Sequence, residues 1–191
     1  VPFGIKLREI IYDIGGGTPQ GTEFKAAQAG GPAGGCVPKE LLDTTLDYET
    51  MGAIGAIIGS GGLVVIDNTR SMVEVAKFFM SFTQDESCGK CTPCREGTKR
   101  LLELLQRLME GHLPKEEIAG IKSLAEFVRD NSLCGLGQNA PNPILSTLKY
   151  FESEYIDCCN HNKPGEDKSK IEYFITERCI GCQRCATECP V

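Results

Sequence analysis

Cysteine constrains this 191-residue chain more than any other residue type, because it occurs eleven times and mostly at fixed short spacings. One run has the pattern C-x2-C-x2-C over residues 88–94, and another has C-x2-C-x2-C-x3-C-P over residues 179–190. Structural disulfides are rare in reducing compartments, and buried cysteines that act as small apolar residues need no regular spacing. The spacing therefore favours metal or redox chemistry at these thiols.

The first run predicts an iron–sulfur cluster. Cys88, Cys91 and Cys94 are spaced so that one turn of chain presents three thiolates to three corners of a [4Fe-4S] cube. Zinc sites more often use two separated C-x2-C pairs, so three cysteines in series favour iron. The alternative is a structural or interaction module in which zinc at the same cysteines only holds loops together.

Composition and charge exclude several other classes of protein. The formal net charge of −6 argues against a nucleic-acid partner. The longest aliphatic run, residues 63–66, is far shorter than the roughly 18 to 20 apolar residues that cross a bilayer, and the first four residues lack the features of a signal peptide. We therefore expect a cytoplasmic protein without a transmembrane segment. Because the sequence does not begin with Met and ends directly after a cysteine run, we expect it to be a fragment.

The first 70 residues have a different character from those that follow. Fourteen of the 22 glycines fall in residues 1–62, which indicates short strands and turns. Apolar spacing predicts a short helix over residues 7–14 and strands over 24–29 and 63–67. Residues 1–70 are therefore expected to form a small first domain.

From residue 71 the apolar period lengthens to about 3.6 residues, which is typical of amphipathic helices. Ser71 is placed as an N-cap, and Pro93 and Pro143 each lie at the first turn of a helix. The four helices are expected over residues 71–82, 92–110, 114–131 and 142–155. Short loops between them predict an antiparallel four-helix bundle over residues 71–157, and an α+β fold for the chain.

Bundle topology suggests where the fourth ligand of the first cluster lies. In an up-down-up-down bundle, the loop between helices one and two and the loop between helices three and four lie at the same end. Cys134 lies in the second of these loops, forty residues after Cys94. We therefore predict that Cys134 completes the set; the alternative is a buried thiol at a helix end.

Favourable charge is expected around this set. The N-termini of the second and fourth helices are expected to face it with partial positive charge. Lys90, Arg95, Lys99 and Arg100 add cationic side chains, which either stabilise the reduced cluster or simply form an ordinary solvated helix face.

The second run matches the spacing of bacterial ferredoxins, in which the first three cysteines share one cluster and the fourth binds another. It predicts that Cys179, Cys182, Cys185 and Cys189 are cluster ligands in a truncated ferredoxin-like motif over residues 179–191, after a polar linker over 158–178. A complete module needs a further run, so the site is expected to be incomplete. The missing run also weakens a third interpretation, a free-standing ferredoxin-like carrier.

Cys158, Cys159 and His161 lie within four residues and are good metal ligands. Adjacent cysteines rarely both reach one ion, and no fourth ligand is evident, so a small zinc or iron site here is the less favoured interpretation. Cys36 is expected to be a buried thiol.

A resemblance to a known family rests on two motifs, S-C-G-K-C-T-P-C-R-E-G over residues 87–97 and S-L-C-G-L-G over residues 132–137. They resemble the NADH-binding flavoprotein subunit of respiratory complex I and its hydrogenase and formate dehydrogenase relatives. The resemblance implies that Cys88, Cys91, Cys94 and Cys134 hold a [4Fe-4S] cluster that takes single electrons from FMN reduced by NAD(P)H.

The resemblance extends over about residues 1–157. Residues 41–44 and 59–67 resemble the soluble-ligand-binding β-grasp domain of that family. The ferredoxin-like extension resembles NAD(P)-linked hydrogenases or formate dehydrogenases. Implied partners are a thioredoxin-like [2Fe-2S] subunit and an iron–sulfur or hydrogenase large subunit. The family's FMN- and NAD(P)-binding domain lies further toward the N-terminus, and the chain has no G-x-G-x-x-G after a strand and no P-loop, so we expect it to bind neither cofactor alone.

Overall fold

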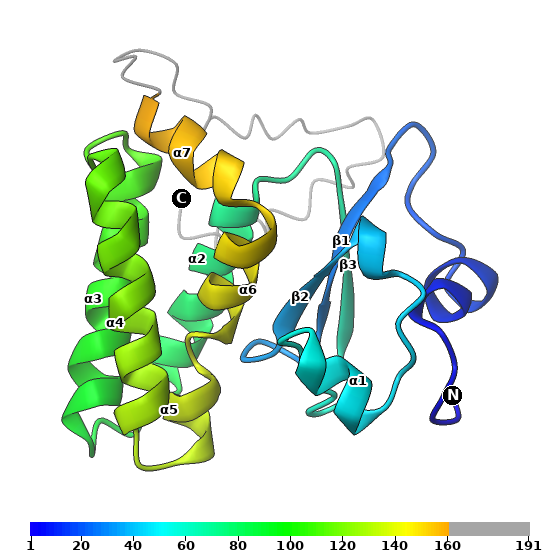
Figure 1. Ribbon diagram of the computed structural model, residues 1–191, viewed down its shortest axis with the longest axis horizontal. Helices are drawn as coiled ribbons and strands as arrows, with labels where there is room; N and C mark the ends of the chain where they lie inside the picture. Colours follow the sequence, from blue (N-terminus) through cyan, green and yellow to red (C-terminus); the bar gives the residue numbers. More distant parts are fainter. Residues whose placement is uncertain (161–191) are drawn as a thin grey trace, which may run out of the picture.

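The computed structural model describes residues 1–160 and places a small antiparallel sheet beside a layer of helices (Figure 1). The mixed helix-and-sheet class expected from the sequence is confirmed. The linker from residue 161 onward and the motif over residues 179–191 lie outside the described residues.

The sheet has three strands in the order β2-β1-β3, and both pairs are antiparallel. β1 (Phe24–Ala29) and β3 (Leu63–Asp67) occupy the predicted positions. β2 (Gly35–Pro38) was not expected, because a four-residue segment flanked by glycine and ending in proline has no strand signal. A tight turn joins β1 to β2, and a Cβ at Gly34 would lie 1.8 Å from the Ala29 carbonyl oxygen, so only glycine fits.

The two faces of the sheet pack against different parts of the chain. One face, with Ala27 and Val37, packs on Leu7, Ile11 and Met51. These residues come from the segment around η1 (Glu9–Ile14), a π-helix where a short helix was expected, and from α1 (Tyr48–Ala53), which was not expected. The 3-10 turn η2 (Lys39–Leu41) follows β2.

The other face of the sheet, with Ala26, Cys36 and Ile66, packs on Met72 at the start of the helical layer. Its helices are α2 (Met72–Asp85), α3 (Thr92–Met109), α4 (Ile118–Asn131), α5 (Gly135–Asn139), α6 (Asn142–Tyr150) and α7 (Glu152–Asn160), with the 3-10 turn η3 (Lys115–Glu117) before α4. They share one hydrophobic core, in which Met80, Leu105, Ile121 and Ile144 are fully buried.

The last predicted helix is wrong in its continuity. Residues 142–155 were expected to form one helix with Phe151 and Tyr155 on a common face. The helix is instead interrupted at Phe151, where φ is −132° and ψ is 35°. Thr147 and Tyr155 then share a buried hydrogen bond of 2.7 Å between their hydroxyl groups, on either side of the break. Helical periodicity continues across the break in the sequence, which is why the break was not foreseen.

A half-buried ion pair connects the sheet to two helices. Ser71 occupies the N-cap position of α2, as predicted, but its side chain makes no capping hydrogen bond. Glu154 of α7 instead accepts the Met72 N–H at 2.8 Å and pairs with Lys25 of β1 at 2.7 Å. Lys25 also donates to the Arg70 carbonyl at 2.6 Å. The charge that caps α2 therefore comes from a residue 82 positions away.

The β2 edge of the sheet is covered by α6. Ser146 accepts the buried Cys36 N–H at 2.9 Å, and Asn142 donates to the Ala33 carbonyl at 3.1 Å. The Cys36 side chain is fully buried, and this burial raises its pKa to about 12, with the nearby Glu154 charge adding to the shift and Lys25 opposing it. The thiol expected to be buried is buried.

We predict that Cys36 resists alkylation in the native chain. Alkylation needs an accessible thiolate, and at pH 8 a pKa near 12 leaves about a thousandfold less thiolate than an ordinary cysteine has. Iodoacetamide labelling followed by mass spectrometry is expected to leave Cys36 unmodified until urea unfolds the chain. Rapid labelling of Cys36 under native conditions would contradict this placement.

Helices α3 and α4 approach most closely where Gly97 faces Val128. A Cβ built at Gly97 would lie 2.2 Å from Val128 Cγ2, whereas a Cβ at Gly120 of α4 meets nothing within 4 Å. Gly97 is buried and Gly120 is exposed. The small residue at position 97 therefore sets the distance between the two helices.

Gly97→Ala is expected to destabilise the chain by about 1–3 kcal/mol through overpacking. Gly120→Ala is the matched control, and we expect it to be neutral or to stabilise by up to about 1 kcal/mol because it restricts the unfolded chain. Urea unfolding followed by circular dichroism measures both. Equal midpoints for the two variants would show that Val128 moves aside without cost.

Candidate metal centre

Four predicted cysteines lie at one end of the helical layer, the end where α5 is labelled in Figure 1. Cys88 is exposed in the loop between α2 and α3, Cys91 is the N-cap residue of α3, and Cys94 is buried in the first turn of α3. Cys134 is exposed and is the N-cap residue of α5. The two loops thus meet at the same end, as the topological argument requires.

The first loop is shaped by hydrogen bonds around Gly89, which has a φ of +71°. The Gly89 N–H donates to the Ser87 hydroxyl at 3.3 Å, and the Arg95 guanidinium donates to the Gly89 carbonyl at 2.6 Å. Ser87 Oγ also lies 3.3 Å from Cys94 Sγ. The residues between the cysteines therefore fix the conformation that presents them.

The second loop is shaped by Ser132 and Gln138. The buried Ser132 hydroxyl donates to the Val128 carbonyl at 2.6 Å, at the end of α4. Gln138 donates from its side chain to the Ser132 carbonyl at 3.1 Å and from its backbone to the Cys134 carbonyl at 3.0 Å. These bonds hold Cys134 between the two helices.

The electrostatics show that the loops act on each other. The Leu133 backbone N–H, in the second loop, is the main cause that lowers the pKa of Cys91, and the Cys94 N–H and the Ser132 hydroxyl add to it. The pKa of Cys94 is raised first by burial and then by the charges of Cys91, Cys134 and Cys88, while the Ser87 hydroxyl opposes the rise. The charges of the other three cysteines thus act on Cys94.

A direct backbone approach joins the two loops. A Cβ at Gly137 would lie 2.6 Å from the Ser132 Cβ and 3.1 Å from the Cys94 Cβ, whereas a Cβ at Gly135 would meet nothing within 4 Å. Ser87, Ser132 and Gly137 belong to the two motifs that carry the family resemblance, but the sequence indicated no structural role for them. The available signal was that small residues surround both cysteine motifs.

The donor set fits a four-iron cluster. Four cysteines are the ligands that such clusters use, and a cube binds each of them at a separate corner. Among residues 1–160, no three His, Cys, Asp or Glu side chains converge closely enough to hold a single metal ion.

The expected surroundings need one correction. The N-terminus of α3 lies at the site as predicted, but the second helix that begins there is the short α5 and not the helix that begins at Asn142. Two of the expected cations also pair with carboxylates: Arg95, which contacts the first loop at Gly89, pairs with Glu96 at 3.0 Å, and Arg100 pairs with Glu103 at 2.9 Å.

Of the remaining predicted ligands, only Cys158 and Cys159 lie among the described residues. Cys158 and Cys159 lie half-buried on α7, against the helical core, and burial raises the pKa of both thiols. His161 lies outside the described residues, as do Cys179, Cys182, Cys185 and Cys189. Metal binding by these residues remains a prediction.

Comparison with known families explains why these cysteines lie together. The model of the NADH-ubiquinone oxidoreductase-F iron-sulfur binding region matches residues 74–158, which include both loops, and a 4Fe-4S binding domain model matches residues 172–191. Over residues 74–158 the chain is therefore similar to the iron–sulfur region of that family. The zinc-only alternative finds no support in these matches.

Individual relatives agree with this family. The chain is 49% identical to the HndC subunit of the NADP-reducing hydrogenase of Solidesulfovibrio fructosivorans, over 100% of this chain and 40% of that protein. It is 38% identical to the corresponding NADH-quinone oxidoreductase subunit of Mycobacterium tuberculosis, over 81% of this chain and 35% of that protein. The chain thus spans well under half the length of these relatives.

A solved structure has the same fold. A chain of the crystal structure of NAD+-reducing [NiFe]-hydrogenase in the H2-reduced state superposes with a TM-score of 0.72 and 28% identity, over 87% of this chain and 27% of that one. Among the described residues of the present chain, no helix is long and apolar enough to cross a membrane.

We predict that Gly137→Ala lowers iron retention. The added methyl group overlaps Ser132 and crowds Cys94, so the two loops separate or distort at a cost of about 1–3 kcal/mol. Gly135→Ala is the matched control in the same short helix, because its methyl group enters open space. Iron and acid-labile sulfide per chain, measured after anaerobic purification, are expected to fall in Gly137→Ala alone. Equal iron content in the two variants would show that iron retention does not require the close packing of Gly137 against Ser132 and Cys94.

Proposed function

We propose that this chain is the electron-transfer portion of an NAD(P)H-linked flavoprotein subunit, and that Cys88, Cys91, Cys94 and Cys134 hold one [4Fe-4S] cluster. The observation that carries the proposal is the meeting of the two cysteine loops at one end of the helical layer, where Gly137 lies against both Ser132 and Cys94. A cluster bound there supplies one-electron storage between a two-electron donor and the next carrier.

The chain's own residues have defined roles in this proposal. The Leu133 and Cys94 amides and the Ser87 hydroxyl face the sulfurs and stabilise their negative charge. The Cys94 side chain is buried and anchors one side of the site in the helical layer, while Cys88 and Cys134 are exposed. One side of the site is thus shielded from water and the other is accessible to a redox partner.

The rest of the pathway lies outside this chain. We place FMN and NAD(P) binding in the further length that the relatives possess. The similarity to an NADP-reducing hydrogenase subunit and the 4Fe-4S match at residues 172–191 favour a hydrogenase or formate dehydrogenase over a plain respiratory enzyme. A thioredoxin-like [2Fe-2S] subunit and an iron–sulfur or hydrogenase large subunit are the proposed partners, in the cytoplasm.

The proposal includes a division of the chain. Residues 1–70 form a β-grasp-like domain, 71–157 a four-helix bundle that holds the cluster, 158–178 a linker, and 179–191 the start of a ferredoxin-like module. The separate hydrophobic cores of the sheet and of the helices support the first boundary. Cys179, Cys182, Cys185 and Cys189 are proposed as ligands whose clusters need further residues.

Metal analysis of anaerobically purified chain tests the ligand set. The wild type is expected to hold about four iron and four acid-labile sulfide per chain. Cys94→Ser is expected to lose most of both, because it removes the buried ligand. Cys36→Ala is the matched control, since it removes a buried cysteine of the sheet that contacts none of the four.

Two outcomes would overturn the proposal. About one zinc per chain without sulfide would make the site structural. Wild-type iron, together with unchanged dithionite-reducible absorbance, in Cys94→Ser would show that the cluster lies elsewhere. Cys182→Ser tests whether the second motif contributes to the measured iron. This variant is expected to keep all four iron atoms, because Cys182 is not one of the four proposed ligands.

A further inference from the structure

The two edges of the sheet, β2 and β3, differ in what covers them. The β2 edge is covered by α6, through the bond between Ser146 and the Cys36 N–H. β3 is the other edge, and within residues 1–160 its only strand neighbour is β1. One long side of β3 therefore presents backbone groups without a strand partner in this part of the chain.

The register identifies the backbone groups at the open edge. The Gly30 N–H donates to the Gly62 carbonyl at 2.9 Å, and pairing continues antiparallel through Gln28 with Val64 and Ala26 with Ile66. Because hydrogen-bonded and non-hydrogen-bonded pairs alternate, Val64 and Ile66 bond to β1. The N–H and C=O groups of Leu63 and Val65 then point away from β1 toward the open edge.

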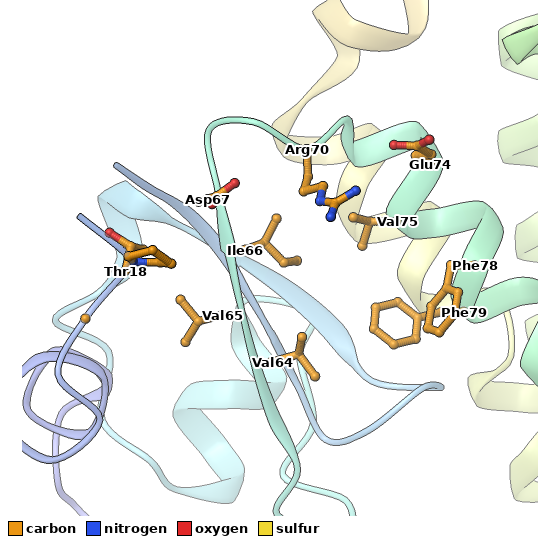
Figure 2. A pocket seen from close by; sticks show the side chains of 12 residues that line it. Thr18, Val64, Val65, Ile66, Asp67, Arg70, Glu74, Val75, Phe78 and Phe79 are labelled. Carbon is orange, nitrogen blue, oxygen red and sulfur yellow. The ribbon is translucent and has the colours of Figure 1, made fainter. Parts of the chain in front are cut away.

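A groove of about 560 Å³ runs along this edge (Figure 2). One wall is α2, where Phe78 and Phe79 lie opposite Val64 and Ile66; the other wall is the segment around Thr18. Asp67, Arg70 and Glu74 lie toward one end. The unpaired edge thus forms the floor of an apolar slot between two walls.

The edge lacks the usual protection against other strands. Natural edge strands carry lysine, proline or inward-pointing charges that discourage pairing. β3 reads Leu-Val-Val-Ile-Asp, with Val64 47% exposed, and Phe78 beside it is 68% exposed. An unprotected apolar edge of this kind is typical of a strand that is permanently paired.

We propose that an extended strand from the same polypeptide, contributed by the length that the relatives have beyond this chain, occupies the slot and pairs with Leu63 and Val65 of β3. The relatives devote about 60% or more of their length to other segments, so such a strand is available. A second copy of this chain fits less well, because each copy carries a net charge of −6. The inferred occupant has apolar side chains at alternate positions, which face Phe78 and Phe79.

Hydrogen exchange at single-residue resolution tests this. In the 191-residue chain, the amides of Leu63 and Val65 are expected to exchange at least about a hundredfold faster than those of Val64 and Ile66. In a polypeptide extended at both ends to the length of the relatives, all four are expected to be protected. Fast exchange of Leu63 and Val65 in the extended polypeptide would overturn the proposal. Protection in the short chain that increases with protein concentration would also overturn it, in favour of a second copy.

A pair of substitutions gives an independent readout. Phe78→Ser is expected to lower the melting temperature of the extended polypeptide more than that of the 191-residue chain, which loses only the edge-to-face contact between the Phe78 and Phe79 rings. Phe82→Ser is the matched control, because Phe82 is 48% exposed on the same helix but does not line the slot. Equal effects of Phe78→Ser in both polypeptides would contradict occupation. Neither measurement depends on iron, so the result is independent of the proposed electron-transfer role.

Discussion

The close approach of α3 to α4 and α5 is the constraint on which the metal centre depends. Gly97 lets Val128 pack against the α3 backbone, and Gly137 lets α5 reach the first turn of α3 beside Cys94. A methyl group at either position would separate segments that are about thirty to forty residues apart in the sequence. The arrangement of the four cysteines therefore depends on the absence of side chains at these two positions as well as on the cysteine motifs.

Bringing four thiols together carries an electrostatic cost, because burial raises the pKa of Cys94 and the charges of the other three cysteines raise it further. Amides and hydroxyls around Cys91 reduce that cost but do not cancel it. A bound metal cluster compensates the thiolate charge directly, so cluster binding and the folding of the two loops are coupled. The rigid helical core makes this coupling local, since residues such as Leu105 and Ile121 pack without any contribution from the site.

The sequence allowed most helices and the meeting of the two cysteine loops to be predicted, because both depend on local spacing and simple topology. Cys134 was placed by the order of helices alone, and β1 and β3 followed from short apolar runs. Tertiary contacts account for what was missed. The break at Phe151 interrupts an unbroken helical period, β2 is too short to give a signal, and Ser71 lost its capping role to Glu154 in a distant helix. Packing at Gly97 and Gly137 likewise has no signature in one sequence.

The ion pair between Glu154 and Lys25, which the sequence did not indicate, also connects the sheet to the helices. Glu154 connects α7 to Lys25 of β1 and to the first amide of α2, so the end of the helical layer is fastened to the centre of the sheet. β2 is held by α6, and β3 leads through Arg70 directly into α2. With these contacts fixed, the β3 edge is held next to α2, where it lines the groove. A rigid, pre-formed edge loses little conformational entropy on pairing, which favours a permanent strand partner over a transient one.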